Sequence, residues 1–176
     1  MTGHESSPST TAHRADAATR DGARCLAITV SDSRTVATDE SGALIERLLT
    51  DAGHVVERQL LTNDEEPLRA ALQTALARSD IDVVLCTGGT GLGARDRTVD
   101  VVRPMLEREL PGFGEIFRML SFLDQIGAAA ILSRAIAGSA REKFVAVMPG
   151  SKAAVELAMT RLIVPELKHT LREIRR

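Results

Sequence analysis

A continuous apolar run, IDVVLCT at residues 81–87, leads directly into a stretch with four glycines in seven residues. An unbroken apolar run of this length is typical of a strand buried on both faces of a parallel sheet. Glycines after such a strand let the chain turn sharply and let backbone N–H groups approach a ligand closely. The stretch TGGTGLGARDRT, residues 87–98, therefore predicts a strand end, a tight loop and the start of a helix.

Two interpretations of this loop are open from its residues alone. A glycine pair often serves only to reverse the chain, but a glycine loop between a buried strand and a helix favours phosphate binding. No Lys-Ser or Lys-Thr pair follows, so the loop is not a Walker A motif, and its spacing differs from the dinucleotide-binding GxGxxG. We therefore expect a phosphate site of another kind.

Strand-like and helical patterns alternate along the rest of the chain. Strands are predicted at 24–30, 54–61, 81–87 and 144–151, and helices from Thr38 or Asp39 to about Gly53, from about Pro67, at 99–108, within 111–120 and after 151; residues 127–138 fit either type. Pro67 suits the first turn of its helix, and Pro104 predicts a kink. The alternation predicts an α/β fold with a mostly parallel central sheet.

Three of the predicted strands end in small polar or glycine-containing loops, with the sequences SDSRT, TGGTG and MPGS. In open parallel sheets, ligands bind beyond the carboxyl ends of the strands. We therefore expect these three loops to converge on one rim of the sheet.

Length and composition narrow the range of functions. The chain of 176 residues, 44% of them hydrophobic, suffices for one globular domain, which we place at residues 23–176 after a disordered leader at 1–22. A formal net charge of -2 and the absence of Trp and Tyr argue against a nucleic-acid partner. Because no apolar run is long enough for a membrane span and no secretory signal is present, we expect a cytoplasmic protein with no membrane partner.

Cysteines, histidines and one apolar region call for structural interpretations. Cys25 and Cys86 lie within short apolar runs and are predicted to be buried hydrophobes rather than disulfide or metal ligands. His54 and His169 have no partner at metal-ligand spacing, which favours structural roles. Residues 112–132 are unusually apolar, so this region is either core or a subunit contact, and we favour the contact.

Two aspartates are candidates for metal binding. A carboxylate beside a bound phosphate is repulsive unless a cation lies between them, and Mg²⁺ held by one or two carboxylates resolves that conflict. Asp96 follows the glycine loop, and Asp64 follows the predicted strand 54–61 and can reach the same rim. Helix capping by Asp64 and a helix-dipole role for Asp96 are the alternatives. Of Arg95 and Arg97, one is expected to pair with a phosphate and the other to be a solvated surface charge.

Four separated motifs, TGGTGLGARDRT, PGFGEIFR, LSRAIAG and MPGS, resemble in order and spacing the molybdenum cofactor biosynthesis proteins of the MoaB/MogA type. The resemblance extends over about residues 24–172. It implies a three-layer α/β domain that forms homo-oligomers, trimers or hexamers, and binds molybdopterin. Catalytic members of the family use Mg²⁺ and ATP to transfer AMP to the terminal phosphate of the pterin.

By motif position, the resemblance assigns Asp64 and Asp96 to catalysis and to magnesium binding. The other candidates are expected to contact the substrates: Ser31, Asp32, Thr87, Gly88, Gly89, Thr90, Gly91, Arg95, Ser121, Ser133, Arg134, Pro149, Gly150 and Ser151. Asn63-Asp64-Glu65 stands where the family often has Pro-Asp-Glu, which leaves Asp64 and Glu65 as alternatives, of which we choose Asp64. Arg97-Thr98-Val99 replaces a common Val-Thr-Pro.

Three functions follow as hypotheses. The leading one is a molybdopterin adenylyltransferase, which needs no side-chain nucleophile because nucleotidyl transfer depends on positioning and charge neutralisation. The second is a non-catalytic molybdopterin carrier or scaffold; the PGS ending favours the MoaB branch, some members of which have no clear activity. The third is a nucleotide- or phosphate-binding regulator that shares only the glycine loop.

Overall fold

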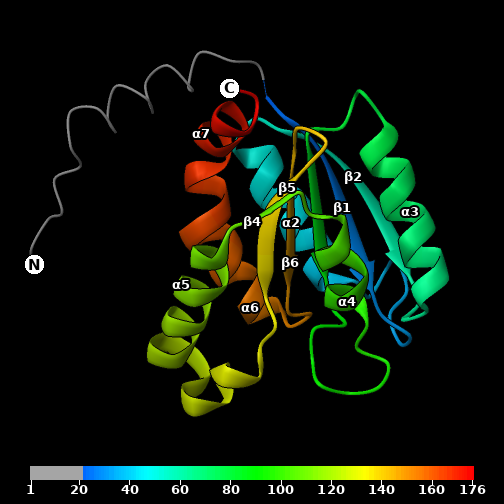
Figure 1. The fold of residues 1–176 in the computed structure, drawn as a ribbon. Coiled ribbons are helices and arrows are strands. Elements are labelled where there is room, and N and C mark those ends of the chain that lie inside the picture. The colour runs from blue at the N-terminus through cyan, green and yellow to red at the C-terminus, as the bar shows by residue number, and fades with distance from the viewer. Residues whose placement is uncertain (1–21) are drawn as a thin grey trace, which may run out of the picture.

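The computed structural model describes residues 22–176. Its centre is a six-stranded sheet with the order β2-β1-β3-β6-β5-β4 (Figure 1). Four strands are parallel to one another: β1 (Arg24–Val30), β2 (Val55–Leu61), β3 (Val83–Thr87) and β6 (Lys143–Met148). At one edge, β5 (Ile136–Ala140) pairs antiparallel with β6, and the short β4 (Arg108–Glu109) pairs antiparallel with β5. The predicted leader at 1–22 lies outside the described residues except for Gly22.

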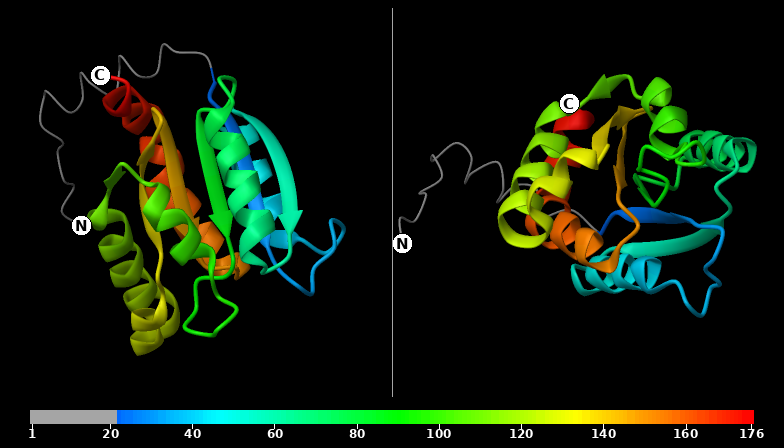
Figure 2. Two further views of the ribbon diagram at one scale, coloured as in Figure 1. Left: turned by 45° about the vertical axis from the view of Figure 1, so that its right-hand side comes forward. Right: turned by 90° about the horizontal axis from the view of Figure 1, so that it is seen from below.

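Helices cover both faces of the sheet. They are α2 (Glu40–Asp51), α3 (Glu65–Ala77), α4 (Thr98–Val102), α5 (Pro111–Ser121), α6 (Lys152–Ala158) and α7 (Val164–Ile174). One hydrophobic cluster joins the sheet to α2, α5, α6 and α7, and a second joins its other face to α3 and α4 (Figure 2). The three-layer α/β/α sandwich with a mostly parallel sheet is therefore confirmed.

Burial along the strands follows their place in the sheet. All five residues of β3 are buried, as expected for a central strand covered on both faces. The edge strand β2 instead alternates between exposed and half-buried residues. Both patterns agree with the strands predicted at 81–87 and 54–61.

The predicted helix boundaries hold for α2 and α3. Asp39 precedes α2, and its side chain accepts a hydrogen bond from the N–H of Gly42, which satisfies one free donor of the first turn. Gly53, at φ 82°, follows the end of the same helix. Pro67 lies in the first turn of α3, where its missing N–H costs no helical hydrogen bond.

The helix predicted at 99–108 is wrong beyond Val102. The chain tightens there into a 3₁₀ turn, η1 (Arg103–Met105), and Arg108–Glu109 then pairs with β5. Pro104 explains the change, since a proline has no N–H to continue the α-helical ladder. The ambiguous segment 127–138 is divided between a 3₁₀ helix, η3 (Gly127–Leu132), and the start of β5.

Both cysteines are buried, as the sequence predicts, and so is His54. Cys25 and Cys86 lie in the two different hydrophobic clusters, and burial raises the pKa of each thiol to about 12. The Nδ1 of His54 accepts a hydrogen bond of 3.0 Å from the N–H of Ala23, and burial lowers the pKa of this imidazole. Within residues 22–176, no helix has the length and apolarity needed to cross a membrane.

The apolar region 112–132 is divided between core and surface. Phe117 is fully buried, and Phe113 and Leu120 pack partly against the core. A π-helical turn, η2 (Phe122–Ile126), connects α5 to η3. Eight large apolar side chains from just before α5 through η3 are exposed, and we call them the α5–η3 surface: Leu110, Ile116, Met119, Phe122, Leu123, Ile126, Ile131 and Leu132.

Candidate functional site

The loops that follow β1, β3 and β6 pack against one another at the carboxyl edge of the sheet (Figure 1). The hydroxyl of Thr87 donates to the carbonyl of Pro149 at 3.0 Å, and the N–H of Gly88 donates to the carbonyl of Met148 at 3.1 Å. On the other side, a Cβ on Gly88 would lie 2.2 Å from the carbonyl oxygen of Val30. The expected convergence of the three loops is thus confirmed.

Gly88 and Gly89 both have positive φ, 99° and 62°, at the point where the loops meet. Gly88 also packs against Gly150, where a Cβ would come within 3.2 Å of the Cα of Gly88. Only residues without a side chain allow this approach of three backbone segments. The glycines therefore shape the loop: Gly88 is buried with its N–H bonded to Met148, and Gly89 and Gly91 are half-buried.

Substitution of Gly88 by alanine is expected to destabilise the protein by at least about 2 kcal/mol, because the φ is unfavourable and the new Cβ meets the Val30 carbonyl. Gly112→Ala is the matched control, since a Cβ there has nothing within 4 Å; its effect is expected to stay below about 1 kcal/mol. Urea unfolding of both variants measures the difference. Equal stability of Gly88→Ala and the wild type would contradict this loop conformation.

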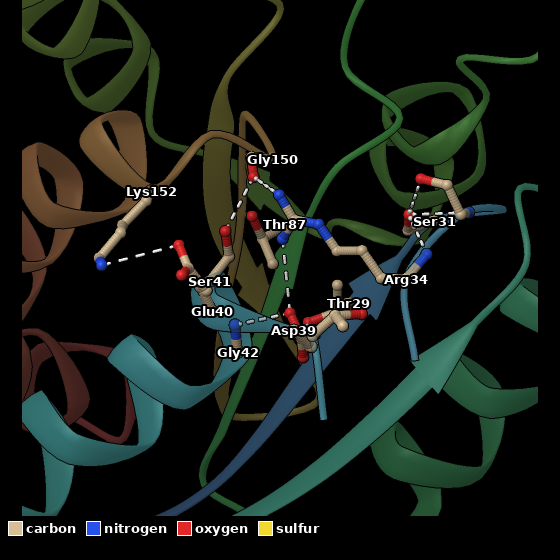
Figure 3. A network of polar contacts seen from close by, with 12 residues as sticks. Thr29, Ser31, Arg34, Asp39, Glu40, Ser41, Gly42, Thr87, Gly150 and Lys152 are labelled. Atoms are coloured by element: carbon tan, nitrogen blue, oxygen red, sulfur yellow. Dashed lines mark hydrogen bonds and ion pairs between the residues drawn. The ribbon is translucent and has the colours of Figure 1, made fainter. Parts of the chain in front are cut away.

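The loop after β6 is held in place by groups from the first third of the chain (Figure 3). The carbonyl of Gly150 accepts hydrogen bonds from the Arg34 guanidinium at 2.9 Å and from the Ser41 hydroxyl at 2.8 Å. The hydroxyl of Ser151 accepts a hydrogen bond from the N–H of Ala154 and so caps α6. Both sides of the turn after β6 are therefore fixed.

Asp39 is the buried centre of this arrangement, with 4% of its surface exposed. Its carboxylate accepts hydrogen bonds from the Thr29 hydroxyl, the Gly42 N–H and the Arg58 guanidinium at 2.9–3.0 Å, and Arg34 lies 3.5 Å away. Burial acts to raise the pKa of Asp39, but the bonds from Gly42, Arg58 and Thr29 together hold it below its usual value. The sequence predicts Asp39 only as a possible helix start and does not identify Arg34 as a residue of the site.

A second set of polar contacts joins the segments after β1 and β2 to the glycine loop. The carboxylate of Asp32 accepts hydrogen bonds from the Asn63 backbone N–H at 2.9 Å and from its side-chain amide at 3.1 Å. Arg95 reaches Asp32 at 3.2 Å and Asp64 at 3.8 Å, so one guanidinium lies beside both carboxylates. The bonds from Asn63, aided by Arg95, lower the pKa of Asp32.

Asp64 and Asp96 are held differently. Asp64 precedes α3 but makes no capping bond to it; its carboxylate accepts a hydrogen bond from Thr62 at 2.7 Å, so the capping alternative is not supported. The Asp96 carboxylate folds back on its own loop and accepts a hydrogen bond from the N–H of Gly93 at 3.0 Å. Arg95 contacts Asp64, and Asp96 is the next residue along the chain.

Two buried polar atoms without hydrogen-bond partners lie against the glycine loop. They are Oδ1 of Asn63 and Oγ1 of Thr98, which would be 3.3 and 2.2 Å from a Cβ on Gly89. Buried polar atoms normally have hydrogen-bond partners, so a ligand that bonded to these two atoms would supply the partners they lack. Asp32 and Asp64 offer the oxygen ligands that Mg²⁺ prefers. Residues 22–176 contain no cluster of three His, Cys, Asp or Glu side chains that could hold a metal ion.

Arg134 braces the glycine loop. It donates to the carbonyl of Thr90 at 3.3 Å and to the carbonyl of Asp96, and it pairs with the Asp100 carboxylate at 2.9 Å. One guanidinium thus ties together the two ends of the segment 90–96. Arg134 therefore lies at the glycine loop, where it donates hydrogen bonds to backbone carbonyls.

The remaining candidates lie in different surroundings. The hydroxyl of Ser133 accepts a hydrogen bond from the N–H of Ala135, beside Arg134. Ser121 is buried at the end of α5, and no hydrogen bond between described residues joins it to the three loops. Arg97 pairs with Glu65 at 3.0 Å, so Arg95 is the arginine that the structure brings to the acids of the rim.

The sequence matches the family described as "Probable molybdopterin binding domain" over residues 26–169. Molybdenum cofactor biosynthesis protein B of Halalkalibacterium halodurans is 54% identical over 152 residues, 86% of this chain and 89% of that protein. The protein of the same name from Bacillus subtilis is 47% identical over 154 residues, 87% of this chain and 91% of that protein.

Solved structures agree with the sequence matches. A crystal structure of molybdenum cofactor biosynthesis protein B superposes with a TM-score of 0.85 at 46% identity and covers 88% of this chain and 97% of that chain. The tungsten cofactor synthesizing protein MoaB of Pyrococcus furiosus gives a TM-score of 0.78 at 34% identity, with coverage of 89% and 99%. The chain therefore belongs to the MoaB/MogA family of molybdenum cofactor biosynthesis proteins.

Proposed function

We propose that this protein binds molybdopterin and Mg-ATP and transfers AMP to the terminal phosphate of the pterin. The observation that carries the proposal is the meeting of three strand-end loops around Gly88 at the carboxyl edge of the sheet. The names of the relatives support a role in molybdenum cofactor biosynthesis. Helix and loop N–H groups of this kind are a common means of holding phosphate.

In the proposed reaction, an oxygen of the pterin phosphate attacks the α-phosphorus of ATP. A new phosphorus–oxygen bond forms, the bond from the α-phosphorus to the bridging oxygen breaks, and pyrophosphate leaves with the electron pair. The protein supplies positioning and charge rather than a nucleophile. Neither cysteine is expected to act as a nucleophile, because a pKa of about 12 keeps the thiols of Cys25 and Cys86 protonated near neutral pH.

Roles for the rim residues follow from their positions. Backbone N–H groups at Gly89–Gly91 would hold a phosphate, since the N–H of Gly88 is bonded to Met148, and Arg95 would offset its charge. Asp64 and Asp96 would hold Mg²⁺. Asp32 is a neighbouring carboxylate, because Arg95 contacts both Asp32 and Asp64. When bound, the ion would neutralise charge on the polyphosphate. The further proposed substrate contacts from the three loops are Ser31, Thr87, Pro149, Gly150 and Ser151, with Ser133 and Arg134 beside the glycine loop. Ser121, buried at the end of α5, is proposed from its motif position alone.

The direct test is incubation of the purified chain with molybdopterin and Mg-ATP, followed by mass spectrometry of the pterin. The expected result is adenylylated molybdopterin and an equal amount of pyrophosphate. Molybdopterin binding with no AMP transfer would select the carrier or scaffold function instead. Nucleotide binding without pterin binding would select the regulator.

The proposal includes self-association through the α5–η3 surface. Eight exposed large apolar side chains on one continuous segment exceed what a monomer usually leaves in water. Replacing Leu123, 66% exposed, with lysine is expected to shift the protein from oligomer to monomer in analytical ultracentrifugation. Val55→Lys is the control, because Val55 is 60% exposed but lies at the start of the edge strand β2. Identical sedimentation of Leu123→Lys and wild type would contradict the contact.

A further inference from the structure

A polar cavity of about 310 Å³ lies between α5 and the chain segment that leads into β5. Three arginines and two glutamates are among its lining residues: Arg103, Arg118, Arg134, Glu109 and Glu115. Arg103 pairs with Glu109 at 3.2 Å, and Arg134 pairs with Asp100. The cavity thus has one more arginine than glutamate, and the guanidinium of Arg118 is the one without a carboxylate partner within residues 22–176.

Arg118 is held weakly. Its Nη1 donates to the carbonyls of Ser133 and Ala135, both at 3.4 Å, which is longer than a typical N–H···O bond. A guanidinium carries five N–H donors, and no acceptor from the described part of the chain bonds Nη2 or Nε. A half-buried cation with unused donors at a cavity is suited to an oxyanion, which guanidinium binds through paired hydrogen bonds.

The backbone of α5 is shaped around this arginine. A Cβ on Gly114 would lie 2.5 Å from the Ala135 carbonyl and 2.9 Å from Nη1 of Arg118. Only glycine therefore lets α5 approach the β5 segment with the guanidinium between them. The cavity also includes Pro111 in the first turn of this 11-residue helix, where the helix dipole favours an anion.

Arg134 forms a common wall between the cavity and the glycine loop. It lines the cavity and also donates to the carbonyls of Thr90 and Asp96. A negatively charged group beside Arg134 would alter the balance of these bonds. Binding in the cavity and the shape of the segment 90–96 are therefore linked through one side chain.

We infer that this cavity is a binding site for a phosphate group, with Arg118 as its principal ligand and Arg134 as its link to the glycine loop. Glu109 is already engaged by Arg103, and Glu115 is exposed to solvent. The phosphate belongs either to the pterin itself or to a free ion. In the first case the inference rests on the proposed function, because that phosphate is the acceptor of AMP; in the second it concerns the binding of an ion alone.

The test is a titration of the full chain with inorganic phosphate, followed by NMR of the Arg118 Nε–H and of backbone amides. Phosphate is expected to shift the signals of Arg118 and Ala135. Arg118→Gln should weaken the binding measured at Ala135 about tenfold or more, since it removes a charged donor pair. Arg118→Lys, which keeps the charge without the planar fork, should be intermediate. Arg47→Gln, an exposed arginine on α2, is the matched control and should bind as the wild type does.

The outcomes separate this site from the glycine loop. Shifts confined to Gly88–Gly91, or equal binding by wild type and Arg118→Gln, would overturn the inference while leaving AMP transfer to its own assay. If molybdopterin displaces phosphate from Arg118, the pterin's own phosphate is the occupant. If phosphate and molybdopterin bind together, the occupant is a free ion.

Discussion

Replacing Asp64 or Asp96 with alanine is expected to lower the rate of AMP transfer about 100- to 1,000-fold, the usual cost of losing one electrostatic contact to a transition state. Asp64 lies beside Arg95, and Asp96 follows Arg95 in the glycine loop. In the proposed reaction the two carboxylates act on the polyphosphate, so the dissociation constant for molybdopterin should change by no more than about threefold. Initial rates and isothermal titration calorimetry measure the two quantities separately.

Asp51→Ala is the control for this pair, since Asp51 is an exposed aspartate at the end of α2 and lies outside the rim. Its rate of transfer should equal that of the wild type. Asp32→Ala, made beside the others, shows whether the carboxylate next to Arg95 contributes as well. Unchanged transfer in both Asp64→Ala and Asp96→Ala would remove the proposed metal role.

Asp39→Ala is expected to lower the free energy of unfolding by about 3–5 kcal/mol, because removing one partner of a buried ion pair leaves the other charge uncompensated. Arg34 and Arg58 would both lose their buried partner, and Arg34 would hold the Gly150 carbonyl less firmly. Urea unfolding at pH 7 measures the loss. Glu46→Ala is the control: Glu46 also pairs with Arg58, but its side chain is 46% exposed, so its loss should cost less than about 1 kcal/mol. Equal effects of the two substitutions would contradict the central role of Asp39.

The same carboxylate gives a pH dependence with a defined sign. Its pKa in the folded protein lies below the ordinary value, so its stabilisation is complete above the unfolded pKa of about 3.9. The stabilisation is lost as the pH falls through the lower, folded pKa. The difference in stability between wild type and Asp39→Ala should therefore shrink below about pH 4.

Much of the fold follows from local sequence patterns. The buried run before the glycine loop identifies the central strand β3, and the alternation at 54–61 identifies the edge strand β2. Loops at the ends of parallel strands share one edge of the sheet, so their meeting could be predicted from order alone. The helix predicted at 99–108 failed because Pro104 and the pairing of Arg108–Glu109 with β5 outweighed the helical pattern.

The polar framework of the site could not be predicted in the same way. Arg34 and Gly150 are 116 residues apart, and nothing in the spacing of either shows that they bond. Asn63 and Thr98 become candidate site residues only in the folded structure, where their unpartnered atoms lie beside Gly89. Arg134 was expected in a substrate pocket, and the structure shows its bonds to the loop backbone. Such contacts depend on tertiary packing, which a local pattern does not encode.

The most direct test of the account is a crystal structure of the protein with adenylylated molybdopterin. We predict phosphate oxygens within hydrogen-bond distance of the backbone N–H groups of Gly89–Gly91, with Asp64 and Asp96 facing the same phosphates. A ligand bound away from the shared edge of β1, β3 and β6, with no contact to the glycine loop, would contradict it.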